Sequence, residues 1–223
     1  MTLTSRQRLI VFIVVAFIID YIPLLNLPFL WSETFFHEIS HGLAALLTGG
    51  TIHNIALNFN GSGVCTTSGG SRFVVSIAGY SGSAVWGFLI YGVANSPSQT
   101  KAKLIVGAMV VTLVMTLLLW ARDLSTITVL IVLLVMYITP LFKSLGFSVQ
   151  FFIQLVGVFV LLDAIRSPLY LLDGRNLGDG ATLAQMTWLP EFFWVGLWFS
   201  IAVSCLYLLW VQSGKDARYR VGV

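Results

Sequence analysis

The sequence predicts an all-α polytopic membrane protein with about six transmembrane helices, a short half-inserted helix and a small β-hairpin insert. Hydrophobic residues make up 57% of the 223 positions and charged residues only 9%, whereas about a quarter of a typical soluble domain is charged. Several apolar runs also reach the length of about 20 residues that a helix needs to cross a bilayer. The twelve basic and nine acidic side chains are too sparse to form a basic patch. The composition therefore excludes a soluble domain and a nucleic-acid-binding protein.

The apolar runs follow one another along the whole chain. They cover residues 9–31, 34–47, 73–94, 104–121, 124–142, 146–163 and 191–211. The polar intervals between them are too short for a separate soluble domain, so we expect residues 1–223 to form a single membrane-embedded domain. The first run contains Asp20, Pro23 and Pro28 and has no small-residue cleavage site. It therefore predicts a retained, broken helix and not a cleaved signal peptide.

The second run is too short to cross a membrane. Its 14 residues would rise about 21 Å as a helix, whereas the hydrocarbon core is about 30 Å thick. We expect a half-inserted helix that starts near Ser32, with the Ser32 hydroxyl as N-cap and Glu33 at the positive end of the helix dipole.

The distribution of basic residues favours the same arrangement. With a cytoplasmic N-terminus and a half-inserted second run, eight basic residues lie inside and four outside, whereas a crossing second run would give six and six. The positive-inside rule prefers the uneven split. Residues 32–72 and 164–190 then lie on the same, non-cytoplasmic side of the membrane.

Two of the three histidines lie in the short run, in the order His37-Glu38-Ile39-Ser40-His41. Positions i and i+4 share one face of a helix, so both imidazoles can bind one tetrahedral Zn²⁺ ion, with Glu38 beside the bound water as general base. The pattern could also arise by chance on a solvated helix. Ionisable residues in an apolar segment are costly and generally functional. We therefore predict one Zn²⁺ per chain, with His37 and His41 as metal ligands and Glu38 as the catalytic base.

A catalytic zinc site generally takes a third protein ligand, and the sequence offers several carboxylates for it. The candidates are Asp163, Asp173 and Asp179. Each has another explanation, because Asp163 can pair with Arg166 one turn away, while Asp173 and Asp179 each precede a glycine, as in ordinary turns. Spacing alone leaves the choice open. His53, the remaining histidine, lies in a polar stretch that predicts a strand.

A β-hairpin is predicted directly after the histidine motif. Apolar and polar residues alternate over 54–59, which is typical of a strand. Asn60-Gly61 then indicates a two-residue turn, and residues 64–67 can form the return strand. The free edge of such a hairpin could hold an extended peptide, and we expect Asn58 and Asn60 to contact it. A purely structural hairpin is the alternative.

The run 73–94 carries pairs of small residues four positions apart, including Ser83 and Gly87. Such pairs let membrane helices approach closely, so we expect this helix to pack against the histidine helix. Tyr80 in this run is expected to fill the interior, with contact to a substrate as the alternative.

Taken in order, these motifs resemble the site-2 protease group of intramembrane zinc metalloproteases, and most closely its small bacterial M50B-like branch. The resemblance runs from residues 37–42 through the glycine-containing segments 47–50, 61–63 and 78–82. It continues at Asp179 and over residues 183–185, 189–190 and Trp198.

The resemblance implies a zinc endopeptidase in which two histidines and one distant aspartate bind the metal within the membrane. Pro168 and residues 172–174 match the signature that supplies this aspartate in larger members, which points to Asp173, although Ile165 replaces the expected asparagine. In the small branch the recurrent acidic position corresponds to Asp179. Either Asp173 or Asp179 is therefore predicted to be the third ligand, and Asp163 is the less favoured candidate.

The leading functional prediction is cleavage of a peptide bond within or next to the membrane by water that zinc and Glu38 activate. The partners would be the lipid bilayer and a membrane protein or peptide substrate, and the location a bacterial cell membrane. One alternative is a metal-binding chaperone or regulator that retains the site without proteolysis. A transporter is another, because Asp20 and Asp163 lie in or at the end of apolar runs, but the chain shows no internal repeat.

Overall fold

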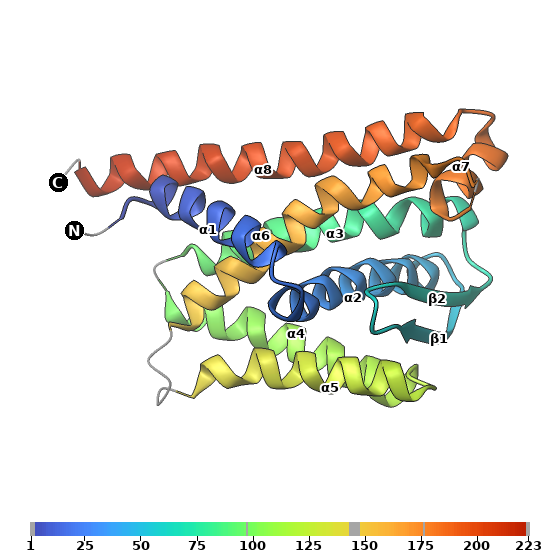
Figure 1. Cartoon of the computed structure of the whole chain (residues 1–223), viewed down its shortest axis with the longest axis horizontal. Coiled ribbons are helices and arrows are strands. Elements are labelled where there is room, and N and C mark those ends of the chain that lie inside the picture. The colour runs from blue at the N-terminus through green and yellow to red at the C-terminus, as the bar shows by residue number, and fades with distance from the viewer. Residues whose placement is uncertain (1–2, 97, 143–147, 176, 222–223) are drawn as a thin grey trace.

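The computed structural model describes residues 3–96, 98–142, 148–175 and 177–221, without the side chains beyond residue 214. Its elements are, in chain order, α1 (Ser5–Asp20), α2 (Pro23–Leu47), β1 (Thr51–Leu57), β2 (Gly63–Ser68), α3 (Arg72–Ala94), α4 (Gln99–Leu119), α5 (Leu124–Ile138), η1 (Thr139–Leu141), α6 (Val149–Arg166), η3 (Ser167–Asp173), α7 (Asp179–Thr187) and α8 (Glu191–Val221). Helices α3, α4, α5, α6 and α8 run along the long axis of the molecule. The hairpin and α7 lie at one end and both termini at the other (Figure 1).

Five of these helical segments are long and apolar enough to cross a membrane, and α1 and α2 together make a sixth candidate across a break bent by 114°. The prediction of an all-α membrane protein with about six spans and a hairpin insert is therefore confirmed. The predicted segments 32–72 and 164–190 also lie at the same end of the bundle (Figure 1). The chain is an integral membrane protein.

The predicted boundary between the first two runs is wrong. The break falls at residues 21–22, and the histidine motif occupies the C-terminal half of the 25-residue helix α2, not a separate short helix. Pro23 occupies the first turn of α2. A backbone N–H at this position has no partner within the helix, so the N–H that proline lacks costs no helical hydrogen bond. At the end of α1, the Asp20 carboxylate forms an ion pair with Arg166 and accepts a hydrogen bond from Asn26 Nδ2 at 3.1 Å. These two contacts, one across the break and one to α6, hold the end of α1 in place.

Ser32 does not cap a helix, contrary to expectation. It lies inside α2, where its hydroxyl donates to the Pro28 carbonyl at 2.7 Å, and Glu33 follows it in the helix interior. The ring of Pro28 prevents the usual helical hydrogen bond to the preceding turn. The helix nevertheless continues, because packing against its neighbours supports it.

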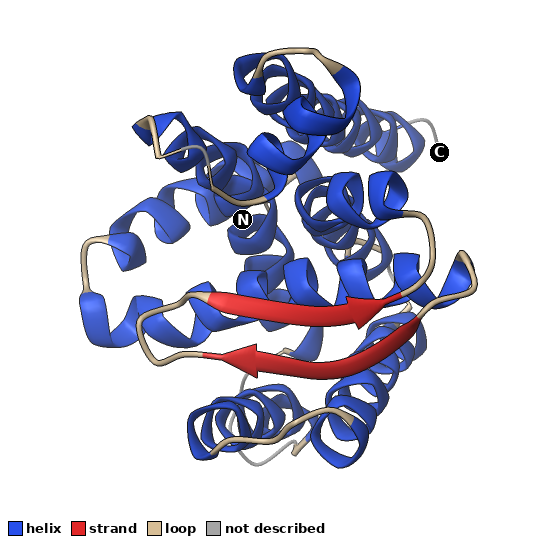
Figure 2. Ribbon diagram, turned by 90° about the vertical axis from the view of Figure 1, so that its right-hand side faces the viewer, coloured by secondary structure: helices blue, strands red, loops and turns tan. Residues whose placement is uncertain are grey.

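The β-hairpin is confirmed, with a longer turn than Asn60-Gly61 predicted. Strands β1 and β2 pair antiparallel from Thr51 opposite Ser68 to Leu57 opposite Gly63, and the hairpin lies across the end of the helix bundle (Figure 2). Residues 58–62 form the connection, in which the Asn58 N–H donates to the Ser62 carbonyl at 2.8 Å.

Helix α2 holds this turn in place. The indole of Trp31 donates to the Phe59 carbonyl at 3.1 Å, and the hydroxyl of Thr34 donates to the Gly61 carbonyl at 2.7 Å. Tertiary contacts to two carbonyls of the turn therefore favour the wider connection over a two-residue turn.

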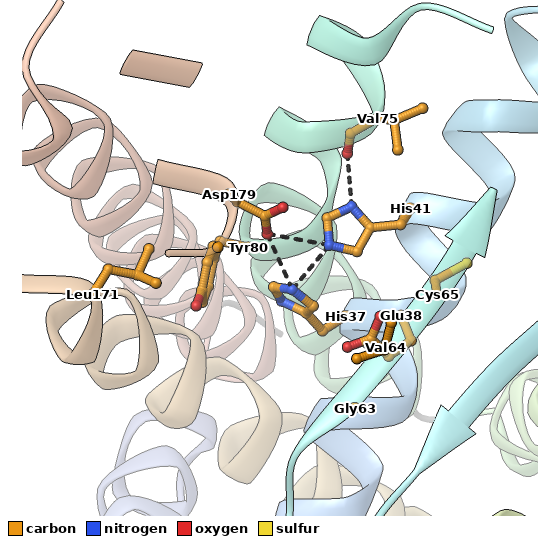
Figure 3. Close-up of a pocket in the computed structure, with 11 residues that line it drawn as sticks. His37, Glu38, His41, Gly63, Val64, Cys65, Val75, Tyr80, Leu171 and Asp179 are labelled. Atoms are coloured by element: carbon orange, nitrogen blue, oxygen red, sulfur yellow. Dashed lines mark hydrogen bonds and ion pairs between the residues drawn. The ribbon is translucent and has the colours of Figure 1, made fainter. Parts of the chain in front are cut away.

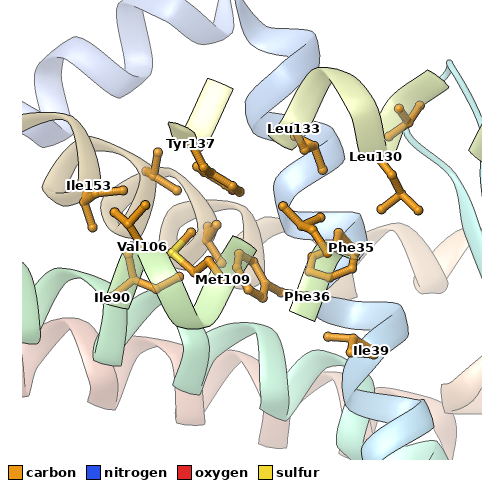
Figure 4. Packing of buried hydrophobic residues seen from close by; sticks show 14 of the residues in the cluster. Phe35, Phe36, Ile39, Ile90, Val106, Met109, Leu130, Leu133, Tyr137 and Ile153 are labelled. Atoms are coloured by element: carbon orange, nitrogen blue, oxygen red, sulfur yellow. The ribbon is translucent and has the colours of Figure 1, made fainter. Parts of the chain in front are cut away.

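One face of α2 is anchored in the core. Phe35, Phe36 and Ile39 are at most 1% exposed and pack against side chains of α3, α4, α5 and α6 (Figure 4). Because this face is fixed, the histidine face of α2 points toward α3 and α7.

The small residues of α3 permit two close approaches. A Cβ atom on Gly82 would lie 2.1 Å from the Ser40 hydroxyl of α2, and one on Gly87 would lie 2.7 Å from the Leu161 backbone nitrogen of α6. The predicted packing against the histidine helix is thus confirmed for Gly82, while Gly87 packs against α6.

Candidate metal centre

His37 and His41 lie one turn apart on α2 and face Asp179, the first residue of α7 (Figure 3). The Nε2 atoms of the two imidazoles are 3.0 Å apart. The Oδ2 atom of Asp179 lies 3.4 Å from His37 Nε2 and 3.2 Å from His41 Nε2. Two helices that are far apart in the sequence, α2 and α7, therefore bring three ligand-type atoms to one point.

The three atoms fit the corners of a metal coordination shell. Bonds of about 2.0–2.1 Å to a tetrahedral zinc ion place neighbouring ligand atoms about 3.3 Å apart, close to the three separations here. Among the described residues, His37, His41 and Asp179 form a group of histidine and acidic side chains able to hold a metal ion. The group could bind a metal through two nitrogens and one oxygen.

A backbone carbonyl orients the second imidazole. His41 Nδ1 lies 2.7 Å from the Val75 carbonyl oxygen of α3. A carbonyl can only accept, so Nδ1 carries the hydrogen and the Nε2 lone pair faces His37 and Asp179. Metal-binding histidines are generally held in this way by an acceptor on the second ring nitrogen.

Gly79 of α3 leaves the space that the two imidazoles occupy. A Cβ atom at this position would lie 2.4 Å from His41 Nε2 and 2.6 Å from His37 Nε2. Sequence reasoning placed this glycine in a packing segment and in a family motif, and missed its contact with the histidines. The available signal was a glycine inside a helix that was expected to lie against the histidine helix.

Glu38 lies beside the histidines in a cavity of about 340 Å³ that all three ligand candidates line. Its side chain is buried. Gly63 of β2 makes room for it, because a Cβ atom on Gly63 would lie 2.7 Å from Glu38 Cγ. Sequence reasoning also missed this role of Gly63. The carboxylate of Glu38 therefore faces the same cavity as the candidate metal ligands without being one of them.

Tyr80 closes another side of the cavity. Its ring lies edge-on to the His37 imidazole, with centroids 4.4 Å apart, and 4.8 Å from the ring of Trp198. The indole of Trp198 donates to the Ile77 carbonyl at 3.1 Å, which locks this stack onto α3. Tyr80 is thus interior packing, as expected, and it also lines the cavity.

The other candidate carboxylates lie elsewhere. The Asp173 carboxylate pairs with Arg175 Nε at 2.8 Å in an exposed loop. The Asp163 carboxylate lies 3.2 Å from Arg166 Nη2 one turn away, as its non-metal alternative predicted. Of the three aspartates, the structure brings only Asp179 to the histidines, whereas His53 bonds to Ser68 within the hairpin at 2.7 Å.

Asn58 and Asn60, the predicted substrate contacts, bond within the hairpin turn. Asn58 Nδ2 donates to the Ser62 hydroxyl at 3.0 Å, and Asn60 Oδ1 accepts from the Ser62 backbone N–H at 3.1 Å. Within the described part of the chain, neither residue lines the cavity. Residues 63–65 of β2 line it instead.

Cys65 lines this cavity with an uncharged thiol group. Burial, together with the nearby Glu38 carboxylate, raises the pKa of the Cys65 thiol to about 12. The thiol is therefore protonated at neutral pH and has little nucleophilic character.

The fold and the site define an integral membrane protein with a candidate metal centre buried near one end of its helix bundle. The Peptidase M50B-like family model matches residues 9–209, and the chain belongs to this family. The resemblance that the sequence motifs indicated is thereby confirmed. No curated protein and no solved structure matches the chain. Membership of a peptidase family indicates a membrane protease.

Proposed function

We propose that this protein is a zinc-dependent endopeptidase that cleaves a peptide bond within or next to the membrane. The observation that carries the proposal is the convergence of His37, His41 and Asp179 in the cavity that also holds the Glu38 carboxylate. Two imidazoles and one carboxylate are a known ligand set of catalytic zinc sites, which keep a further position open. The proposed stoichiometry is one Zn²⁺ per chain.

When bound, zinc would acidify water and polarise the scissile carbonyl group. Glu38 is the proposed general base: its carboxylate accepts the proton of the attacking water and later delivers it to the leaving amine. Val75 and Gly79 keep the two imidazoles oriented toward the metal position, while Tyr80 packs against His37. The chain itself thus supplies the base and a rigid setting for the reaction.

The depth of the site supports cleavage at the membrane. Gly79, which touches both histidines, lies seven residues after the start of α3, or about 10 Å along the helix. A peptide bond that reaches Glu38 therefore lies inside or just beneath one end of the membrane-spanning bundle. This position suits a membrane protein or membrane-associated peptide as substrate, and we propose a bacterial cell membrane as the location.

Strand β2 offers a place for an extended substrate. The outer edge of β1 is occupied, because the Ile55 N–H donates to the Trp120 carbonyl at 3.1 Å and the Leu57 N–H donates to the Thr126 hydroxyl at 2.8 Å. The outer edge of β2 faces the cavity, and residues 63–65 line it (Figure 3). We propose that the substrate adds to this edge as a further strand.

The metal site is tested by measuring zinc per chain in detergent-purified protein. We expect about one zinc ion in the wild type and a large loss in His41→Ala and Asp179→Asn, because each removes one of three ligands. Asp173→Asn is the matched control and should keep its zinc, since Asp173 pairs with Arg175 away from the site. A well-folded wild type that binds no zinc after reconstitution would refute the proposed site.

The proteolytic step is tested with Glu38→Gln. This variant should keep its zinc and lose cleavage of any substrate that the wild type processes, by at least about a hundredfold. Cleavage that survives the substitution would contradict the role of Glu38. Bound zinc in a wild type that cleaves no membrane protein would favour the non-proteolytic, metal-binding alternative.

A further inference from the structure

A second cavity, of about 500 Å³, lies beside the metal cavity. Val75 lines both cavities. Strand β2 also lines both, with residues 63–65 at the metal cavity and Thr67 and Ser68 at the second one. Helix α7 lines the metal cavity with Asp179 and the second cavity with Thr182, three residues later. The two cavities are therefore neighbours along one continuous wall.

The second cavity combines one cation with several hydroxyl groups. Arg72, the first residue of α3, lines it, and the structure shows no ion pair or hydrogen bond for its guanidinium group within the described residues. Ser76 lies one turn further along α3, lines the same cavity and is only 6% exposed. Thr67, Ser68 and Thr182 add three more hydroxyl groups to the wall.

This set of groups fits a carboxylate. A guanidinium group binds carboxylates through paired N–H donors, and a hydroxyl group on the same wall can donate a further hydrogen bond to the carboxylate. Among the described residues no acidic side chain pairs with Arg72, whereas Arg166 and Arg175 each have a carboxylate partner.

We propose that this second cavity is a substrate subsite that binds an acidic side chain of the peptide to be cleaved. The proposal rests on the proposed protease function. A peptide strand along β2 advances 3.2–3.4 Å per residue, so its path from residue 64 to residues 67–68 spans roughly three or four residues. An Asp or Glu at that distance from the scissile bond reaches Arg72 and Ser76. Because antiparallel pairing is the more stable, the acidic residue lies on the N-terminal side of the scissile bond.

Peptide binding tests the subsite separately from cleavage. The probes are fluorescein-labelled decapeptides of alanine, valine and threonine that carry one Asp at successive positions, each paired with the same peptide carrying Asn. They are titrated into zinc-loaded full-length Glu38→Gln protein in detergent. At the preferred position we expect the Asp peptide to bind about tenfold more tightly than its Asn counterpart.

The preference should depend on Arg72 and on salt. Arg72→Gln in the Glu38→Gln background should abolish it, Ser76→Ala should reduce it, and Arg72→Glu should favour a Lys peptide. Arg175→Gln is the matched control, because Arg175 is exposed, as Arg72 is, but lines neither cavity. High NaCl should weaken the preference of the Glu38→Gln protein itself, a readout that needs no substitution in the second cavity.

Cleavage of matched Asp and Asn substrates gives the second readout. With Glu38 intact, the Asp substrate should have the lower KM, and Arg72→Gln should raise that KM about tenfold and leave the KM of the Asn substrate within twofold. An Arg72-dependent Asp preference in binding, with no cleavage by the wild type, would support the subsite and refute the protease. Cleavage of both substrates without any preference would support the protease and overturn the subsite.

A lipid headgroup is the competing occupant. If Asp and Asn peptides bind alike while purified wild type retains phosphatidylglycerol and Arg72→Gln does not, the cavity binds lipid phosphate and the proposal is wrong.

Discussion

Gly79 lies against the imidazoles of both His37 and His41, in space that any other side chain would fill. We expect Gly79→Ala to lower the zinc affinity at least tenfold, because the new Cβ atom would lie 2.4 Å from His41 Nε2 and force the rings apart. Competition with a zinc chelator, measured on purified protein, gives this affinity directly.

The control for this substitution lies on the same helix. A Cβ atom on Gly92 has no neighbour closer than 3.9 Å, so Gly92→Ala should bind zinc as the wild type does. Equal affinities of all three proteins would contradict the close contact of Gly79 with the imidazoles.

Asp123 stabilises helix α5, because its side chain caps the N-terminus of that helix. Its carboxylate accepts hydrogen bonds from the Ser125 hydroxyl at 2.6 Å and the Thr126 backbone N–H at 2.9 Å. The Thr126 hydroxyl in turn accepts from the Leu57 N–H of β1. The bond from Ser125, followed by those from Thr126, lowers the pKa of Asp123.

Asp123→Ala should therefore reduce stability by about 1 kcal/mol, the usual effect of losing a capping side chain. Because the folded-state pKa is lowered, the charged carboxylate stabilises the fold fully above its ordinary pKa. The contribution is lost as pH falls through the lowered pKa. Thermal unfolding in detergent at neutral and acidic pH should show a difference from wild type that shrinks in acid.

Asp123→Asn is the informative comparison, because asparagine also caps helices well but carries no charge. It should lose less stability than Asp123→Ala and show a smaller dependence on pH. A difference between wild type and Asp123→Ala that is the same at both pH values would rule out the charged cap.

At the scale of the whole molecule, the hairpin and α7 lie at one end and both termini at the other (Figure 1). Arg6 and Arg8 lie near the N-terminus, and Lys101 and Lys103 lie in the first turn or two of α4. The positive-inside rule places basic residues of short connections on the cytoplasmic side. We therefore expect the end that carries the candidate metal centre to face away from the cytoplasm.

Single cysteines in a Cys65→Ser, Cys205→Ser background test this orientation. In intact cells, a membrane-impermeant maleimide should label Asn60→Cys in the hairpin turn, and it should label Lys101→Cys only after permeabilisation. Both positions are exposed, so accessibility within the protein does not limit either reaction. The reverse labelling pattern would place the site on the cytoplasmic side.

Local patterns in the sequence determined a large part of this architecture. Hydropathy predicted the spans, because a bilayer demands long apolar helices. The spacing of His37 and His41 predicted two imidazoles on one helix face, because residues four apart are neighbours on any α-helix. Alternation over 54–59 predicted a strand and a hairpin for a similar local reason. The residues offered Asp163, Asp173 and Asp179 as the third ligand, and the family resemblance favoured Asp173 and Asp179 over Asp163.

The remaining features depend on contacts between residues far apart in the chain. Asp179 reaches the histidines because it begins α7, which lies beside α2, whereas Asp173 ends η3 and pairs with Arg175. The sequence predicted a break in the first run, and the tertiary structure adds the ion pair of Asp20 with Arg166 of α6 at that point. The hairpin turn widens because α2 bonds to its carbonyls. The contacts of Asp179 with the histidines, of Arg166 with Asp20 and of α2 with the hairpin turn join residues far apart in the chain, so only the tertiary structure could decide them.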